Sequence, residues 1–140
     1  MPPLRLLAAA LVVPSLGLSA CTQTKKSSVS SFQGEQRAVA QTLEDLQKAG
    51  SDRDGTKICE HLLTRSLVQK IQQSSKTDCP KAVGDRLSDV DSFDLTVKQV
   101  QISGNSATAT VNSAVGSSKD RVDRLRLVRD GRNWKVDSLG

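Results

Sequence analysis

The sequence predicts an α+β domain in which N-terminal helices pack on a curved antiparallel sheet of about four strands. Apolar residues recur at a helical period from Val39 to Val90 and at a strand period after Leu95. Glycine-containing turns at Gly104-Asn105 and Asp130-Gly131 divide the second half into strands. The chain has 140 residues, enough for one domain, and its two Phe, one Trp and no Tyr allow only a small core.

Residues 1–20 have the features of an export signal. Arg5 supplies a positive charge, and an apolar run follows that is too short and too broken for a comfortable membrane span. The run ends in Leu18-Ser19-Ala20-Cys21, which resembles the lipobox of bacterial lipoproteins. In that family the cysteine thiol receives a diacylglyceryl group, and a peptidase then cuts before it. The resemblance implies lipidation at Cys21, with an ordinary secretory signal as the alternative.

Residues 21–32 are expected to be the lipidated cysteine and a polar tether, and residues 33–140 the domain. Residues 22–31 show no hydrophobic period. If flexible, ten such residues would span roughly 16–19 Å on average. The protein would then sit on the extracytoplasmic face of the cell membrane, held by the lipid at Cys21.

The first half of the domain is predicted to be helical. Val39, Leu43 and Leu46 mark an amphipathic helix over residues 33–49, which Gly50 would end. Shorter helices are expected to start at three capping residues, each followed by apolar residues at helical spacing. These caps are Asp54, Thr64 and Asp78.

The first two strands are predicted to form a hairpin, and the first strand is predicted to contain a β-bulge. Leu95 and Val97 differ in parity from Val100 and Ile102, so one extra residue near Lys98 and Gln99 would bring all four to one face. A turn at Gly104-Asn105 would then pair Ile102 with Ala107 and Val100 with Ala109.

The last two strands are predicted to form a hairpin around Asp130-Gly131. A two-residue turn there would place Leu127 opposite Trp134 and Leu125 opposite Val136.

Cys59 and Cys79 are expected to form a disulfide, because two thiols in an exported domain usually pair. A metal site with His61 is the alternative, but zinc needs four ligands and the chain has one His. A catalytic Cys–His pair is disfavoured because positions i and i+2 of a helix diverge. We expect no metal and no cofactor.

A basic stretch runs from Lys119 to Lys135. Strand parity places Arg124, Arg126 and Lys135 on the outer face of the sheet, with Arg126 opposite Lys135. Such a patch suits anionic headgroups or wall polymers, whereas nucleic acid is excluded by export and by the lack of aromatic stacking residues. The alternative is a solvated face that protects an edge strand.

The last strand and the first hairpin carry a family resemblance. Gly131, Trp134, Val136, Asp137 and Leu139 resemble a "G-x-W-x-V-D-x-L" ending, with one additional residue between Gly131 and Trp134. With the hairpin from Ile102 to Val111, this order resembles the nuclear transport factor 2-like superfamily, an α+β cone, and in particular small actinobacterial lipoproteins of that type.

The resemblance implies a pocket between sheet and helices, which the isomerases and dehydratases of the superfamily use for catalysis. Those isomerases pair an inward Asp base with a Tyr or a protonated Asp, and this chain has no Tyr. Asp123 is the best catalytic candidate, as a base with a raised pKa, unless it simply pairs with a neighbouring Arg. Ala107 and Ala109 would leave room for a small ligand.

We therefore expect a lipid-anchored, non-catalytic interaction domain. Binding of a small apolar ligand in the cone is the first alternative, and an isomerase- or dehydratase-like enzyme is the second. The sequence does not indicate an oligomeric state.

Overall fold

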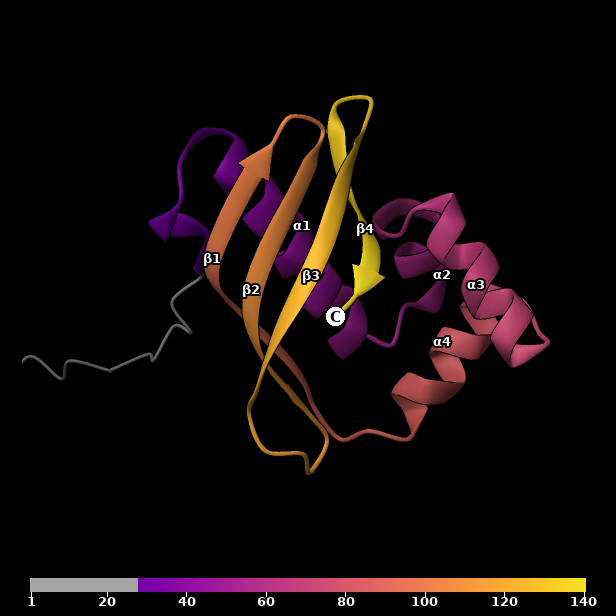
Figure 1. Cartoon of the computed structure of the whole chain (residues 1–140). Helices are drawn as coiled ribbons and strands as arrows, with labels where there is room; N and C mark the ends of the chain where they lie inside the picture. The colour runs from indigo at the N-terminus through magenta and orange to yellow at the C-terminus, as the bar shows by residue number, and fades with distance from the viewer. Residues whose placement is uncertain (1–27) are drawn as a thin grey trace, which may run out of the picture.

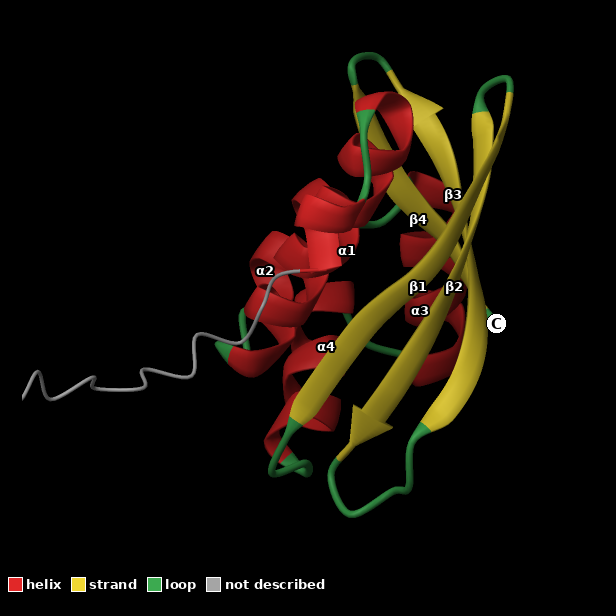
Figure 2. Cartoon of the chain, turned by 90° about the vertical axis from the view of Figure 1, so that its left-hand side faces the viewer, coloured by secondary structure: helices red, strands yellow, loops and turns green. Residues whose placement is uncertain are grey.

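The computed structural model describes residues 28–140 and shows helices packed on one face of a four-stranded antiparallel sheet (Figures 1 and 2). The predicted fold class is therefore confirmed. Cys21 and residues 1–20 lie outside the described residues. The strands follow one another in the sheet in chain order: β1 (Phe93–Ser103), β2 (Ser106–Val115), β3 (Arg121–Asp130) and β4 (Asn133–Leu139).

The helical layer consists of one long helix and several short ones. The long helix α1 crosses behind the sheet, and the others lie beside β4 (Figure 1). The elements are the 3-10 turn η1 (Ser28–Ser31), α1 (Gly34–Ser51), α2 (Gly55–Lys57), the π-helical turn η2 (Ile58–Leu62), α3 (Arg65–Ser75) and α4 (Cys79–Ser88).

The three predicted helix caps are confirmed. The side chains of Asp54, Thr64 and Asp78 each accept a hydrogen bond from a backbone amide three residues later, at 2.9, 3.2 and 3.1 Å. Each bond satisfies a donor that the first helical turn leaves unpaired. Local sequence chemistry thus fixes where these helices begin.

Two predicted boundaries of the helical half are wrong. The first helix continues through Gly50 to Ser51. A Cβ built on Gly50 would lie 2.4 Å from Cδ1 of Phe93, so this glycine permits close approach of α1 to β1 and does not end the helix. The packed chain also begins earlier than residue 33, because Val29, assigned to the tether, is buried.

The first hairpin has the predicted geometry. The register shifts between Val97 and Gln99, and Ile102 pairs with Ala107 across the Gly104-Asn105 turn. The extra residue, Lys98, absorbs the change of parity, so that apolar residues before and after it face the helices.

The register of the last hairpin differs from the prediction. Its turn is Gly131-Arg132, which places Leu127 opposite Val136 and Leu125 opposite Leu139. Only the first central residue, Gly131, has a positive φ, of 63°, and hairpin turns of this kind place glycine at that position. From Leu127 to Asp130 the register is shifted by two residues, so these side chains keep their predicted face but change partner. A second irregularity between Arg126 and Leu127 adds one residue to the shift, which turns Ser138 outward, opposite Arg126, and Leu139 inward, opposite Leu125.

Both edge strands are tied to neighbouring segments through their outward-facing backbone groups. Along β1, side chains of α1 bond the Val100 carbonyl (3.0 Å) and the Leu95 amide (3.1 Å). Along β4, the Thr64 amide donates to the Val136 carbonyl at 2.9 Å. Backbone groups that already have a hydrogen-bond partner cannot pair with a strand of another chain. These contacts therefore protect both edges of the sheet against edge-to-edge association.

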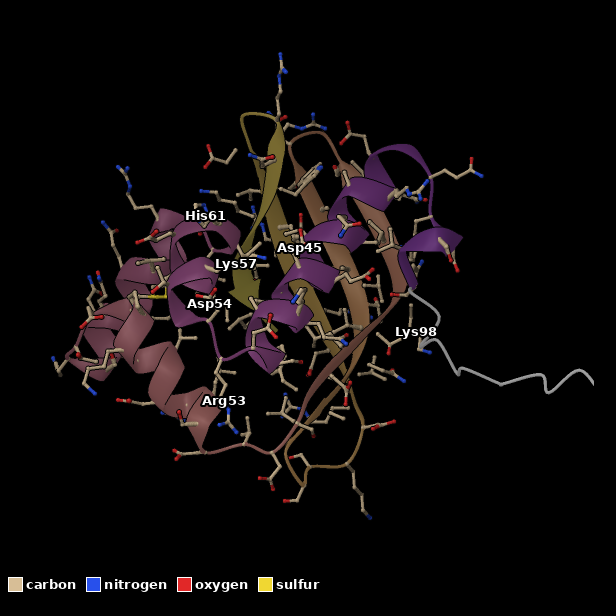
Figure 3. All side chains as sticks on the ribbon, turned by 180° about the vertical axis from the view of Figure 1, so that it is seen from behind. Asp45, Arg53, Asp54, Lys57, His61 and Lys98 are labelled. Carbon is tan, nitrogen blue, oxygen red and sulfur yellow. A yellow bond between two sulfur atoms is a disulfide. The ribbon has the colours of Figure 1, made fainter. Side chains whose placement is uncertain are left out.

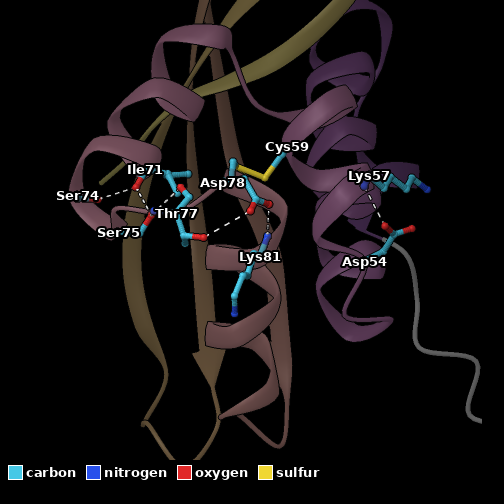
Figure 4. Close-up of a disulfide and its surroundings, with 10 residues drawn as sticks. Asp54, Lys57, Cys59, Ile71, Ser74, Ser75, Thr77, Asp78 and Lys81 are labelled. Atoms are coloured by element: carbon cyan, nitrogen blue, oxygen red, sulfur yellow. Dashed lines mark hydrogen bonds between the residues drawn. A yellow bond between two sulfur atoms is a disulfide. The ribbon is translucent and has the colours of Figure 1, made fainter.

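The structure contains the expected disulfide. Cys59 in η2 is bonded to Cys79 at the start of α4, with the two Cα atoms 6.1 Å apart (Figure 4). Both cysteines are buried. The bond fastens α4 to the segment that runs from α1 to α3, and these helices form one wall of the cavity described next.

Candidate ligand cavity

A cavity of about 300 Å³ lies between the helical layer and the inner face of the sheet. Its walls are almost wholly apolar. From the helical side it is lined by Leu46, Ile58, Leu63, Ile71, Val83 and Leu87, and from the sheet by Phe93, Leu95, Val115, Leu125 and Leu139. Small-molecule sites in proteins are commonly concave, apolar and about this size or larger.

The cavity does not lie where the sequence placed it. Ala107 and Ala109 do not line it, and they are 2% and 0% exposed within the core. The sheet side is lined instead at the opposite end of β2, by Ser113 and Val115. There the opposite wall is supplied by the last turns of α1 at Leu46, by Ile58 and Leu63, and by the short helices α3 and α4.

Three polar side chains meet on the cavity wall near the start of β3. Asp123 faces inward, with its side chain 23% exposed, and accepts a hydrogen bond from the Ser113 hydroxyl of β2. Nη2 of Arg121 lies 3.1 and 3.2 Å from the two carboxylate oxygens of Asp123. The antiparallel pairing brings these residues together, because Asp123 pairs with Val111 and Arg121 with Ser113.

The pKa of Asp123 is lowered from its ordinary value, first by the hydrogen bond from Ser113 and then by Arg121, against an opposing effect of burial. Asp123 is therefore a charged hydrogen-bond acceptor at neutral pH. The expectation of a raised pKa is wrong, because both neighbours are donors that favour the carboxylate. The predicted inward direction and the predicted arginine partner are both present.

A second polar cluster fastens α1 to the last hairpin. Oε2 of Glu35 accepts from Nε1 of Trp134 at 3.1 Å and from Nη2 of Arg129 at 2.5 Å. The Arg129 guanidinium also lies 5.0 Å from the centre of the Trp134 ring. This cluster was not predictable from the expected register, which set Leu127 opposite Trp134, whereas in the structure Arg129 is opposite Trp134.

Cys59 and His61, considered above as a metal site or a catalytic pair, do not line the cavity as a pair. Cys59 is held in the disulfide, and His61 is exposed on the outer side of the helical layer (Figure 3). Within residues 28–140, no three His, Cys, Asp or Glu side chains are grouped so that they could hold a metal ion. In the same range no helix has the length and apolar character of a membrane span.

The three basic residues predicted on the outer face, Arg124, Arg126 and Lys135, lie on that face of the sheet, which faces the viewer in Figure 1. Arg124 and Arg126 are exposed and stand opposite Thr110 and Thr108 of β2. The predicted pairing of Arg126 with Lys135 is wrong: Arg126 faces Ser138, and Lys135 lies 3.1 Å from the Asp130 carboxylate. The shifted turn thus relieves the expected repulsion between like charges.

A solved structure aligns with part of this chain. No protein-family profile matches the chain, and no curated protein matches it. A crystal structure from Streptomyces avermitilis, provisionally described as a dehydratase of the NTF2-like family, is 11% identical in sequence with a TM-score of 0.47. The match covers 71% of this chain and 88% of that one.

Proposed function

We propose that this protein is an exported, lipid-anchored binding protein that holds a small, largely apolar molecule in the cavity and does not catalyse a reaction. The observation that carries the binding role is the apolar cavity of about 300 Å³ with a single polar corner. Export and lipidation are supported by the lipobox-like Leu18-Ser19-Ala20-Cys21 and the apolar run before it.

The polar corner suggests what the ligand carries. Among the described residues that line the cavity, Asp123 and Arg121 are the ionisable ones. Because Asp123 is held as a carboxylate, a ligand group that reaches it must donate a hydrogen bond, as a hydroxyl or an amine does. We therefore propose a ligand with an apolar body and one hydroxyl or amino group.

The cavity gives no support for general base catalysis. A base at neutral pH works best with a pKa near the operating pH, whereas the Asp123 pKa is lowered. Its carboxylate oxygens also accept hydrogen bonds from Ser113 and Arg121, which stabilise the charged form and leave lone pairs for one further donor. The same contacts suit a fixed acceptor that orients a ligand.

Binding of N-phenyl-1-naphthylamine, a fluorescent probe with an apolar body and one N–H donor, tests the proposal. Val115→Phe adds bulk inside the cavity and is expected to weaken probe binding at least tenfold. Val122→Phe adds the same kind of bulk to the outer face, where Val122 is 71% exposed, and is expected to leave binding unchanged. Equal probe affinity in the two folded variants would refute a cavity site.

A further inference from the structure

We propose that the outer face of the sheet rests on an anionic phospholipid surface, with Arg124 and Arg126 as the headgroup contacts. This orientation rests on the proposed anchoring, which keeps the domain beside a bilayer, but it concerns a surface remote from the cavity. Within residues 28–140 no helix packs on this face of the sheet (Figure 2).

The two arginines form a site of suitable chemistry for phosphate groups. They alternate with inward residues on β3, so their Cα atoms lie roughly 6.5 Å apart along the strand. Their neighbours across β2 and β4 are the hydroxyl residues Thr110, Thr108 and Ser138. A guanidinium binds phosphate through two parallel hydrogen bonds, and adjacent hydroxyls can donate further ones.

Among the described residues, these arginines differ from the other basic residues of β3 and β4 because no carboxylate pairs with them. Arg121, Arg129 and Lys135 each form an ion pair, with Asp123, Glu35 and Asp130 respectively. Within residues 28–140 no ion pair or hydrogen bond of the Arg124 or Arg126 side chain is found. The positive charge of this face is therefore available to an external anion.

A third feature of the face is apolar. Val122 precedes Arg124 on the same side of β3 and is 71% exposed, the largest exposure among the large hydrophobic residues of the described chain. An exposed aliphatic side chain beside unpaired arginines suits a membrane interface, where apolar groups enter the headgroup region and cations meet phosphates.

The length of chain before the domain is compatible with this orientation. Seven peptide steps separate Cys21 from Ser28, which limits the reach to about 25 Å. The turn η1 begins at Ser28 and packs against both α1 and the edge strand β1. Because neighbouring strands lie about 4.8 Å apart, β3 is roughly 10 Å from that edge, within this reach of the bilayer.

The test measures partition of residues 22–140, which contain the whole core and the disulfide, onto vesicles of phosphatidylglycerol and of phosphatidylcholine. We expect binding to phosphatidylglycerol alone. Replacing both arginines, Arg124→Gln and Arg126→Gln, should weaken it about thirtyfold at low salt, at about fivefold for each charge near the surface.

The matched control is Arg65→Gln with Lys70→Gln on α3, which removes two exposed charges from the helical layer. It should weaken binding less than threefold. Equal losses in both pairs would contradict the proposal, because net charge alone would then explain binding. Binding to a purified anionic wall polymer that is lost with the arginine pair, while vesicle binding is kept, would assign the face to that polymer instead.

This measurement does not depend on the lipid at Cys21 or on the cavity. A failure of the proposed function, with no lipid or no bound molecule, would leave the vesicle result interpretable. Loss of selectivity for phosphatidylglycerol would reject the orientation while leaving the cavity proposal in place.

Discussion

Glu35 is the residue through which the first turn of α1 is held to the last hairpin. Its carboxylate accepts from Trp134 and Arg129, and these contacts lower its pKa, first through the Arg129 hydrogen bond. A carboxyl whose pKa is lower in the folded state stabilises the fold above its unfolded pKa. That contribution is lost as the pH falls through the folded value.

Glu35→Gln is expected to destabilise the domain at pH 7, because the neutral amide loses the charge-assisted hydrogen bond with Arg129. Below the ordinary glutamate value of 4.5, the unfolded chain takes up a proton at Glu35 before the folded chain does, so the difference between wild type and variant should shrink as the pH falls. Urea unfolding at pH 7 and pH 3 measures it, with Glu60→Gln, an exposed glutamate of η2, as the control. A difference that is the same at both pH values would contradict the assignment.

Gly55 shows why one glycine is required and another is not. A Cβ at Gly55 would lie 2.4 Å from the Pro80 carbonyl oxygen of α4, whereas a Cβ at Gly84 of α4 would meet nothing within 4 Å. Both residues are helical, so propensity alone favours alanine at either position. Only the contact with backbone atoms distinguishes them.

Gly55→Ala is therefore expected to lower the free energy of unfolding by about 1–3 kcal/mol, because α2 and α4 must separate. Gly84→Ala should raise it by about 0.5–1 kcal/mol through helix propensity. Denaturant unfolding of both variants gives the two signs. If both substitutions change the free energy of unfolding in the same direction, the close packing of α2 on α4 does not explain the glycine at position 55.

At the scale of elements, the disulfide joins two short segments that have little helical stability of their own. Isolated helices shorter than about 12 residues are marginal in water, and α4 has ten residues. The bond closes a loop across a sequence separation of 20 between η2 and α4. It therefore holds α4 in place as a wall of the cavity.

Replacing both cysteines, Cys59→Ala and Cys79→Ala, is expected to cost about 3 kcal/mol of stability, from the entropy of the opened loop. The expected outcome is a lower urea midpoint in the variant, matched by wild type treated with a reductant. A wild-type midpoint that reductant leaves unchanged, with free thiols shown by alkylation, would contradict a stabilising role.

The elements also show which parts of the fold are encoded locally. The caps at Asp54, Thr64 and Asp78 and the turn at Gly104 depend on residues within four positions, and they were predictable. The roles of Gly50 and Gly131 were misjudged, because contact with Phe93 decides the first and a choice between adjacent turn positions decides the second.

The candidate site was predictable only in part, because contacts between residues distant in the sequence determine its shape. Asp123 was correctly placed on the inner face by strand parity. Its contact with Ser113 joins two strands, and the cavity wall includes segments as distant as Leu46 and Leu139. No sequence period reports where helices leave space, so the cavity was expected beside Ala107 and Ala109, where α1 fills it.

At the scale of the whole molecule, the sheet separates two surfaces of different character. Its inner face, together with the helices, encloses an apolar cavity with one polar corner. Its outer face carries the unpaired arginines of β3, while both edges are bonded to α1 or to the segment before α3. The arrangement suits a domain that holds a ligand on one side and meets an anionic surface on the other.

The most direct test of the account is the mass of the protein isolated from its own membranes, measured under native and then denaturing conditions. We expect the denatured chain to lack residues 1–20, to carry a diacylglyceryl or triacyl addition at Cys21 and to lack two hydrogens for the disulfide. The native measurement should show an additional bound mass that is absent from the Val115→Phe variant. An unlipidated chain, or a native mass equal to the denatured one in wild type, would contradict the account.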